Sequence, residues 1–172
     1  GGEVGRNRNR YEILEGLLFS LVELGEIATA ERELERIARG QIDLQEFVPL
    51  YREFLRWWQG RRPELAAFHP QHQVLPHVAC WELEFRLARG EDPAALLAAL
   101  PARREAAAGA EALFLALESE PRHRLGERDE ALALAREAVS RAAIDGDRDL
   151  AVHVHRPLLA RRLAALEAAA KP

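Results

Sequence analysis

LGERDEALALAREA, residues Leu125 to Ala138, combines a helix stop signal with the start of a second helix. A left-handed backbone position after the last helical residue is most cheaply occupied by glycine, and Gly126 stands at such a position. After it, Ala131, Ala135 and Ala138 recur at spacings of four and three, the period of a helix with one buried face. The stretch therefore predicts two helices joined by a short turn.

The same signal occurs four times along the chain. Gly25, Gly60, Gly90 and Gly126 are separated by 35, 30 and 36 residues, which is the spacing of helix-turn-helix repeats. Neither helix of such a pair can bury its apolar face alone, so we expect neighbouring pairs to stack. The expected repeats cover approximately residues 11–40, 43–69, 76–104 and 110–143, and a terminal helix follows at 147–169.

The repeated unit resembles the tetratricopeptide repeat (TPR), in which a turn glycine and small residues of the second helix let helices approach closely. The fourth unit carries this pattern at Gly126, Ala131 and Ala138. The first unit carries it at Leu14, Leu17, Leu21, Leu24, Gly25 and Ala30. The resemblance implies an all-α fold, a right-handed stack of antiparallel helix pairs (an α-solenoid) with about four repeats and a terminal helix. It is most similar to the repeat regions of large bacterial signalling and regulatory proteins.

The domain organisation follows from length and composition. A chain of 172 residues with 48% hydrophobic and 30% charged residues can build one globular core, which we expect over residues 11–172. Residues 1–10 are polar except for Val4, and they are expected to form a disordered tail or linker. Pro121 is expected to interrupt the first helix of the fourth repeat, because an interior proline removes a backbone hydrogen bond.

Charge and hydropathy exclude several classes of function. The net charge is −4, and basic and acidic residues are interspersed, so no basic surface for nucleic acid is expected. No apolar run reaches the length of a membrane helix, which favours a cytoplasmic protein without membrane partners. Lys171 is the only lysine among 24 basic residues, a bias typical of GC-rich bacterial genomes.

The segment HPQHQVLPH offers a cluster of histidines, which are metal-ligating residues. His69, His72 and His77 lie within nine residues, and three imidazoles are a zinc ligand set that leaves one position open. Pro70 and Pro76 instead indicate a connecting loop, because residues before proline are pushed out of the helical region. We therefore predict a polar loop without metal, with the three histidines as the alternative zinc site.

Two further features of the sequence bear on catalysis and cofactor binding. Cys80 lies in the apolar setting HVACWELEF, which predicts a buried and inert thiol rather than a nucleophile. The isolated glycines do not form a phosphate-binding loop. The sequence therefore predicts no enzyme activity and no cofactor.

An aromatic-rich helix is the best candidate for binding. One face of the segment 44–58 carries a regular apolar stripe, and Phe47, Phe54 and Trp57 form a second apolar face. Either neighbouring repeats cover this second face, or it is an exposed groove that anchors the helix or extended peptide of a partner. Arg52 and Arg56 lie beside it and would favour an acidic partner.

These observations predict a non-catalytic scaffold that binds a protein or peptide, as part of a larger bacterial regulatory protein. The alternative is a sensor of a small molecule or metal, which would use a pocket between helices and the loop with His69, His72 and His77. A third alternative is a purely structural role, in which the repeats pack on another domain or on a second copy of the chain in a homo-oligomer.

Overall fold

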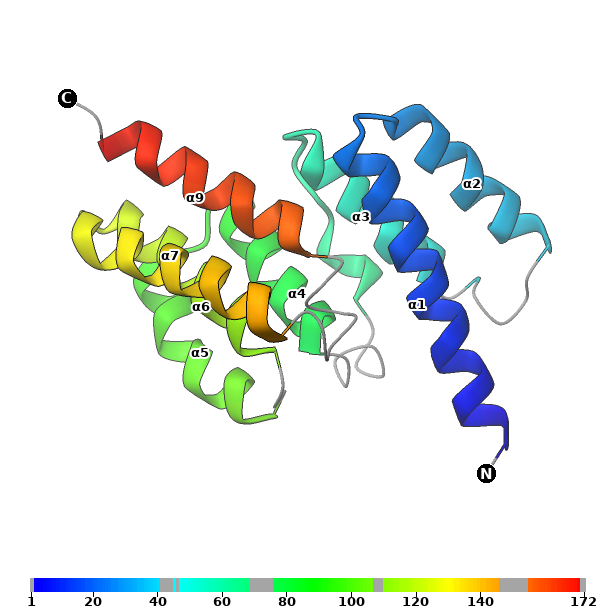
Figure 1. Ribbon diagram of the computed structural model, residues 1–172, viewed down its shortest axis with the longest axis horizontal. Helices are drawn as coiled ribbons and strands as arrows, with labels where there is room; N and C mark the ends of the chain where they lie inside the picture. The colour runs from blue at the N-terminus through cyan, green and yellow to red at the C-terminus, as the bar shows by residue number, and fades with distance from the viewer. Residues whose placement is uncertain are drawn as a thin grey trace. The chain divides into compact units, whose positions relative to one another are not determined.

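The computed structural model describes residues 2–40, 45, 47–68, 76–106, 110–145 and 155–170. Over these ranges the chain is all-α, with eight α-helices, short 3₁₀ segments and no strand. The helices are α1 Gly2–Glu23, α2 Ile27–Gly40, α3 Val48–Trp58, α4 Pro76–Ala88, α5 Pro93–Ala106, α6 Glu111–Arg124, α7 Arg128–Asp145 and α9 Arg156–Ala170, and the 3₁₀ turn η2 is Leu65–Ala67 (Figure 1). None of these helices is both long enough and apolar enough to cross a bilayer.

The chain divides into two compact units, Gly1–Ala67 and Phe68–Pro172. The first unit holds α1, α2, α3 and η2, and the second holds α4, α5, α6, α7 and α9. A single domain over 11–172 stays a prediction. Helix α1 begins at Gly2 and so includes most of the segment 1–10, for which the sequence predicts a disordered tail.

The four turn glycines adopt one common conformation. Their φ angles are 77° at Gly25, 76° at Gly60, 90° at Gly90 and 88° at Gly126, all in the left-handed region. At Gly126 the glycine N–H donates to the carbonyl of His123, and the next N–H, of Glu127, donates to the carbonyl of Arg122. The same two bonds recur at the other three glycines. This pattern is the Schellman helix ending, so the predicted stop signals are confirmed at all four positions.

We expect Gly126→Ala to destabilise the protein by about 1–2 kcal/mol, because an L-residue is strained in the left-handed region. The loss of stability would come from backbone strain and not from a steric clash, because a Cβ at this position would meet no atom within 4 Å. The control is Gly16→Ala in the middle of α1, where a Cβ is also unobstructed and alanine should stabilise the helix by up to about 1 kcal/mol. Urea unfolding followed by circular dichroism measures both. Equal signs for the two changes would contradict this account.

A second helix follows three of the four turns. Helices α2, α5 and α7 begin within three residues of Gly25, Gly90 and Gly126. Asp92 caps the start of α5, because its carboxylate accepts the N–H of Ala94 at 3.1 Å.

The turn at Gly60 is different. The helix expected from RRPELAAF is only the 3₁₀ turn η2 within the described residues. The backbone N–H of Glu64 donates to the Glu53 carboxylate of α3 at 2.7 Å, which holds this segment against α3. Residues 69–75 lie outside the described ranges.

In the first unit, α1 buries a different stripe from the one predicted. Of the residues in the TPR-like pattern, Leu14 is buried, but Leu17 is 39% and Leu24 75% exposed. Phe19 and Val22 take their places in the core. Helix α1 is apolar on more than one side, so the sequence alone does not say which side α2 and α3 cover. An exposed stripe of Ile13, Leu17 and Leu24 remains along α1.

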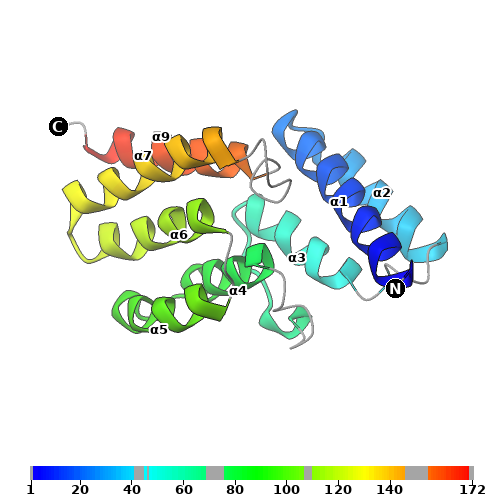
Figure 2. The same cartoon turned by 60° about the horizontal axis from the view of Figure 1, so that its bottom comes forward.

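In the second unit, α6 is the central helix. It contacts α4, α5, α7 and α9, and Figure 2 shows it between α5 and α7. Its buried residues surround the helix, and they are Ala112, Leu113, Phe114, Leu115, Ala116, Leu117, Ser119 and Pro121. The predicted interruption at Pro121 is wrong, because α6 continues through it to Arg124. Pro121 is itself buried, so the packing of its ring offsets the lost hydrogen bond.

The last helix of the described chain, α9, packs beside α7. Arg156, its first residue, donates to the carbonyls of Ala142 and Ala143 in the last turns of α7. These carbonyls lie near a helix end, where backbone acceptors lack partners within the helix. The predicted start of the terminal helix at 147 lies outside the described residues, because 146–154 are not described.

Candidate functional site

The aromatic face of α3 is largely core. Phe54 is 1% and Phe47 6% exposed, so the alternative in which these two rings serve as exposed anchors is wrong. The Phe54 ring packs against Phe19 of α1, with 4.8 Å between ring centroids. Next to it, the Tyr51 hydroxyl donates to the buried Glu15 carboxylate of α1 at 2.7 Å. Helix α1 therefore covers the part of α3 that the sequence left open to a partner.

The remaining residues of this predicted site are partly accessible but already engaged. Trp57 is half-buried and its ring lies 5.8 Å from that of Phe54. Arg56 is half-buried and pairs with Glu53 at 3.0 Å. The exposed Arg52 donates to Glu35 of α2. A role of Trp57, Arg52 or Arg56 in partner binding stays a prediction.

The predicted histidine loop is only partly described. His69 and His72 lie outside the described residues, and His77 is buried in the first turns of α4. Among the described residues, no group of three His, Cys, Asp or Glu side chains is placed to hold a metal ion. His77 instead has two aromatic neighbours, with its ring 5.5 Å from Trp81 and 5.6 Å from His155.

A polar face of α4 is buried against α9. His77, Trp81 and Glu84 follow one another at spacings of four and three, so they share one side of the helix. The Trp81 indole N–H donates to Nε2 of His155, at 2.9 Å, just before α9 begins. Glu84 binds both terminal nitrogens of Arg162 at 2.7 Å, and Arg162 also donates to the carbonyl of Ala116 in α6.

The side chains of this polar face join α4 to α9, and they leave no room for a ligand. The space beside it measures about 10 Å³, which is at most the size of one water molecule. Burial alone lowers the pKa of Arg162, but the charge and hydrogen bonds of Glu84 more than offset it, so that pKa lies above its ordinary value. Burial raises the pKa of the Cys80 thiol, and the Glu84 charge raises it further. Cys80 is therefore held as a neutral thiol and is poorly suited to act as a nucleophile.

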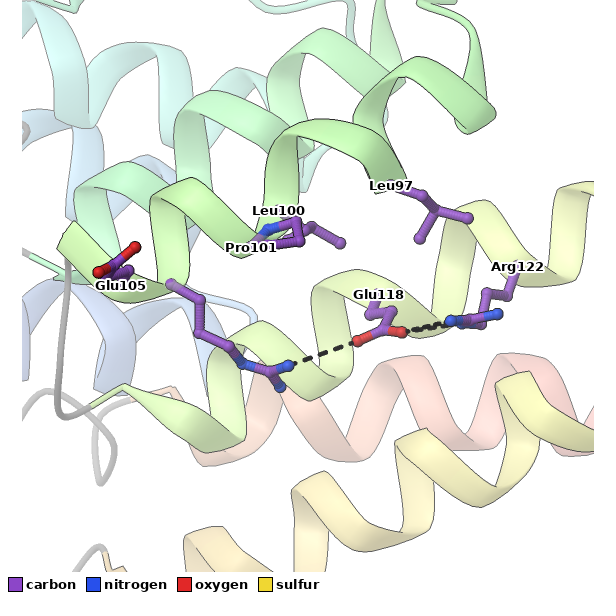
Figure 3. A pocket seen from close by; sticks show the side chains of 7 residues that line it. Leu97, Leu100, Pro101, Glu105, Glu118 and Arg122 are labelled. Atoms are coloured by element: carbon purple, nitrogen blue, oxygen red, sulfur yellow. Dashed lines mark hydrogen bonds and ion pairs between the residues drawn. The ribbon is translucent and has the colours of Figure 1, made fainter.

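A groove between α5 and α6 in the second unit combines apolar and charged side chains. Its volume is about 500 Å³, and its lining residues are Leu97, Leu100, Pro101, Arg104, Glu105, Glu118 and Arg122. Figure 3 shows Leu97, Leu100 and Pro101 on α5 opposite Glu118 and Arg122 on α6. The α5 wall is apolar at Leu97, Leu100 and Pro101 and charged at Arg104 and Glu105, and the α6 wall is charged. This combination is typical of binding sites that fix both affinity and orientation.

An ion-pair network holds the charged side chains of the groove in place. Glu118 lies 2.8 Å from Arg122 and 3.7 Å from Arg104, so it bridges the two arginines. Arg122 also contacts Glu127 at 2.8 Å and Glu130 at 3.2 Å, both from the region where α7 begins. The hydrogen bonds that Arg122 donates to Glu118 and Glu127 raise the pKa of Arg122 above its ordinary value.

Sequence reasoning missed this groove. Its apolar residues repeat at spacings of three and one on α5, and its charges are interspersed like those of the rest of the chain. The signal present in the sequence is Pro101, which lies inside α5 three residues before Arg104. The fold brings Arg104 to Glu118. Only the packing of α5 on α6 brings these residues together.

Comparison with models of protein families, with curated proteins and with solved structures gives no match.

Proposed function

We propose that the chain is a non-catalytic helical-repeat module that binds a protein or peptide partner through the groove between α5 and α6. The observation that carries the proposal is the fourfold Schellman turn at Gly25, Gly60, Gly90 and Gly126. A repeated helix ending of this kind supports a TPR-like α-solenoid, in which the grooves between successive helices are extended binding surfaces. The setting we propose for it is a larger bacterial regulatory protein.

The groove meets the physical requirements of a recognition site. Leu97, Leu100 and Pro101 offer apolar area to a partner side chain, and Leu97 is only partly buried. The network of Arg104, Glu118 and Arg122 is built before binding, so a partner does not have to order these side chains. Preorganisation of this kind lowers the entropic cost of association.

The test compares three forms of the full chain as bait in a pull-down from bacterial lysate. Leu97→Gln changes the apolar wall of the groove. Leu134→Gln is the matched control, because Leu134 is also partly buried against the same core but lies on α7 outside the groove. We expect the wild type and Leu134→Gln to recover the same partner and Leu97→Gln to lose it, with equal helicity by circular dichroism. Recovery that is equal with all three baits would contradict the proposed site.

A small-molecule ligand is the second candidate, and the groove volume favours it. Pockets for small ligands measure roughly 300–1,000 Å³, and this groove of about 500 Å³ falls in that range. A thermal-shift screen of metabolites on the wild type and on Leu97→Gln separates the two candidates. A compound that stabilises only the wild type would favour the sensor over the peptide-binding module.

A further inference from the structure

The charges around the α5–α6 groove are unbalanced. Two arginines stand there, Arg104 and Arg122. Five glutamates either line the groove or pair with these arginines, and they are Glu105, Glu111, Glu118, Glu127 and Glu130. Three carboxylates are therefore in excess, and a groove of one dominant charge attracts partners of the opposite charge.

Among these carboxylates, the side chain of Glu105 is available to pair with a partner. It lines the groove at the last turn of α5, its side chain is exposed, and the described part of the chain offers it no ion pair or hydrogen bond. Glu118 and Glu127, in contrast, already accept hydrogen bonds from Arg122. A cationic side chain entering the groove would therefore find its first free acceptor at Glu105.

Arg104 offers a hydrogen-bond donor beside Glu105. Its Nε and Nη2 are buried, and Nη2 lies 2.8 Å from Glu111, so these two atoms face the protein. Its Nη1 lies 3.7 Å from Glu118, which is too far for a hydrogen bond, and the Arg104 side chain is 35% exposed. A carboxylate ligand would be repelled by Glu105 and Glu118, so a neutral acceptor such as a peptide carbonyl fits better at Nη1.

We propose that the α5–α6 groove binds a peptide segment in which a lysine or arginine stands close to apolar residues. The cationic side chain pairs with Glu105, an apolar side chain packs on Leu97, Leu100 and Pro101, and a backbone carbonyl accepts from Arg104. This inference rests on the proposed function and gives it a ligand chemistry. It also reverses the acidic partner that Arg52 and Arg56 of α3 suggest from the sequence.

The experiment selects a displayed library of random twelve-residue peptides on the full-length chain, and then measures individual peptides by fluorescence anisotropy. Glu105→Lys reverses the free charge of the groove. Glu23→Lys is the matched control, because Glu23 is also an exposed glutamate in the last turn of a helix, but it lies on α1 in the other unit. We expect selected peptides to be rich in Lys or Arg beside Leu, Ile, Val or Phe.

Binding of these peptides should weaken about five- to tenfold in Glu105→Lys and less than about twofold in Glu23→Lys, because an attraction becomes a repulsion only in the groove. Raising the salt concentration should weaken binding to the wild type. Selected peptides that are acidic or neutral, or that bind Glu105→Lys as well as the wild type, would overturn this inference but leave a peptide-binding function in place. A library that yields no binder would contradict both.

Discussion

Arg162→Met is expected to lower the free energy of unfolding of the second unit by about 3–5 kcal/mol. The change leaves the Glu84 carboxylate buried at 6% exposure without the two hydrogen bonds that Arg162 gives it. It also removes the donor to the Ala116 carbonyl. Urea unfolding followed by circular dichroism measures the loss as a lower midpoint concentration.

Two controls separate the buried pair from ion pairs in general. Arg136→Met breaks an exposed pair with Glu167 that also joins α9 to a neighbouring helix, and it should cost at most about 1 kcal/mol. The double variant Glu84→Leu/Arg162→Met removes both buried charges and should recover most of the stability. If Arg162→Met costs no more than Arg136→Met, the Glu84 pair does not hold α9 in place.

Phe54→Ala is expected to destabilise the first unit by about 3–5 kcal/mol, because it opens a cavity in a well-packed core. Phe54 is 1% exposed and packs against Phe19 of α1 and, on its own helix, against Trp57 and Trp58. Trp57→Ala should cost less, about 1–2 kcal/mol, since the Trp57 side chain is only half-buried. Chemical unfolding of both variants gives the comparison.

The same pair of variants tests the site predicted on α3. An exposed anchor can be removed with little loss of stability, whereas a core residue cannot. A Phe54→Ala protein as stable as the wild type would mean that this ring does not belong to the core, and would restore the aromatic face of α3 as the candidate binding surface.

The features that the sequence predicts well are local. Each of the four helix endings depends on one glycine and two backbone hydrogen bonds within six residues, so the pattern around Gly126 was sufficient to find the others. The N-cap at Asp92 is equally local. All-α structure follows from the same short-range patterns.

The features that the sequence does not reveal depend on contacts across long separations. Trp81 and His155 are 74 residues apart, and Glu84 and Arg162 are 78 residues apart. No periodicity within α4 or α9 indicates these pairings. The buried His77, Trp81 and Glu84 on α4 would otherwise be interpreted as a mixed helix face.

The buried face of a helix that is apolar on several sides is hard to predict for a different reason. The sequences of α1 and α3 each contain more apolar residues than one face can bury, and which face is covered depends on the packing partner. Leu17 and Leu24 of the TPR-like pattern are therefore exposed, and Phe47 and Phe54 of the predicted second apolar face are buried. The α5–α6 groove was missed because its residues come from two helices.

The buried contacts of α4 with His155 and Arg162 also determine the order in which parts of the second unit fold during synthesis of the chain. Helix α4 leaves the ribosome first, and its Trp81 indole and Glu84 carboxylate then have to remain hydrated until residues 155–162 emerge. Closing so long a loop is slow compared with forming α6 and α7, which are neighbours in sequence. A nascent chain paused before residue 155 would thus expose the polar face of α4, and completion of the second unit would coincide with the arrival of Arg162.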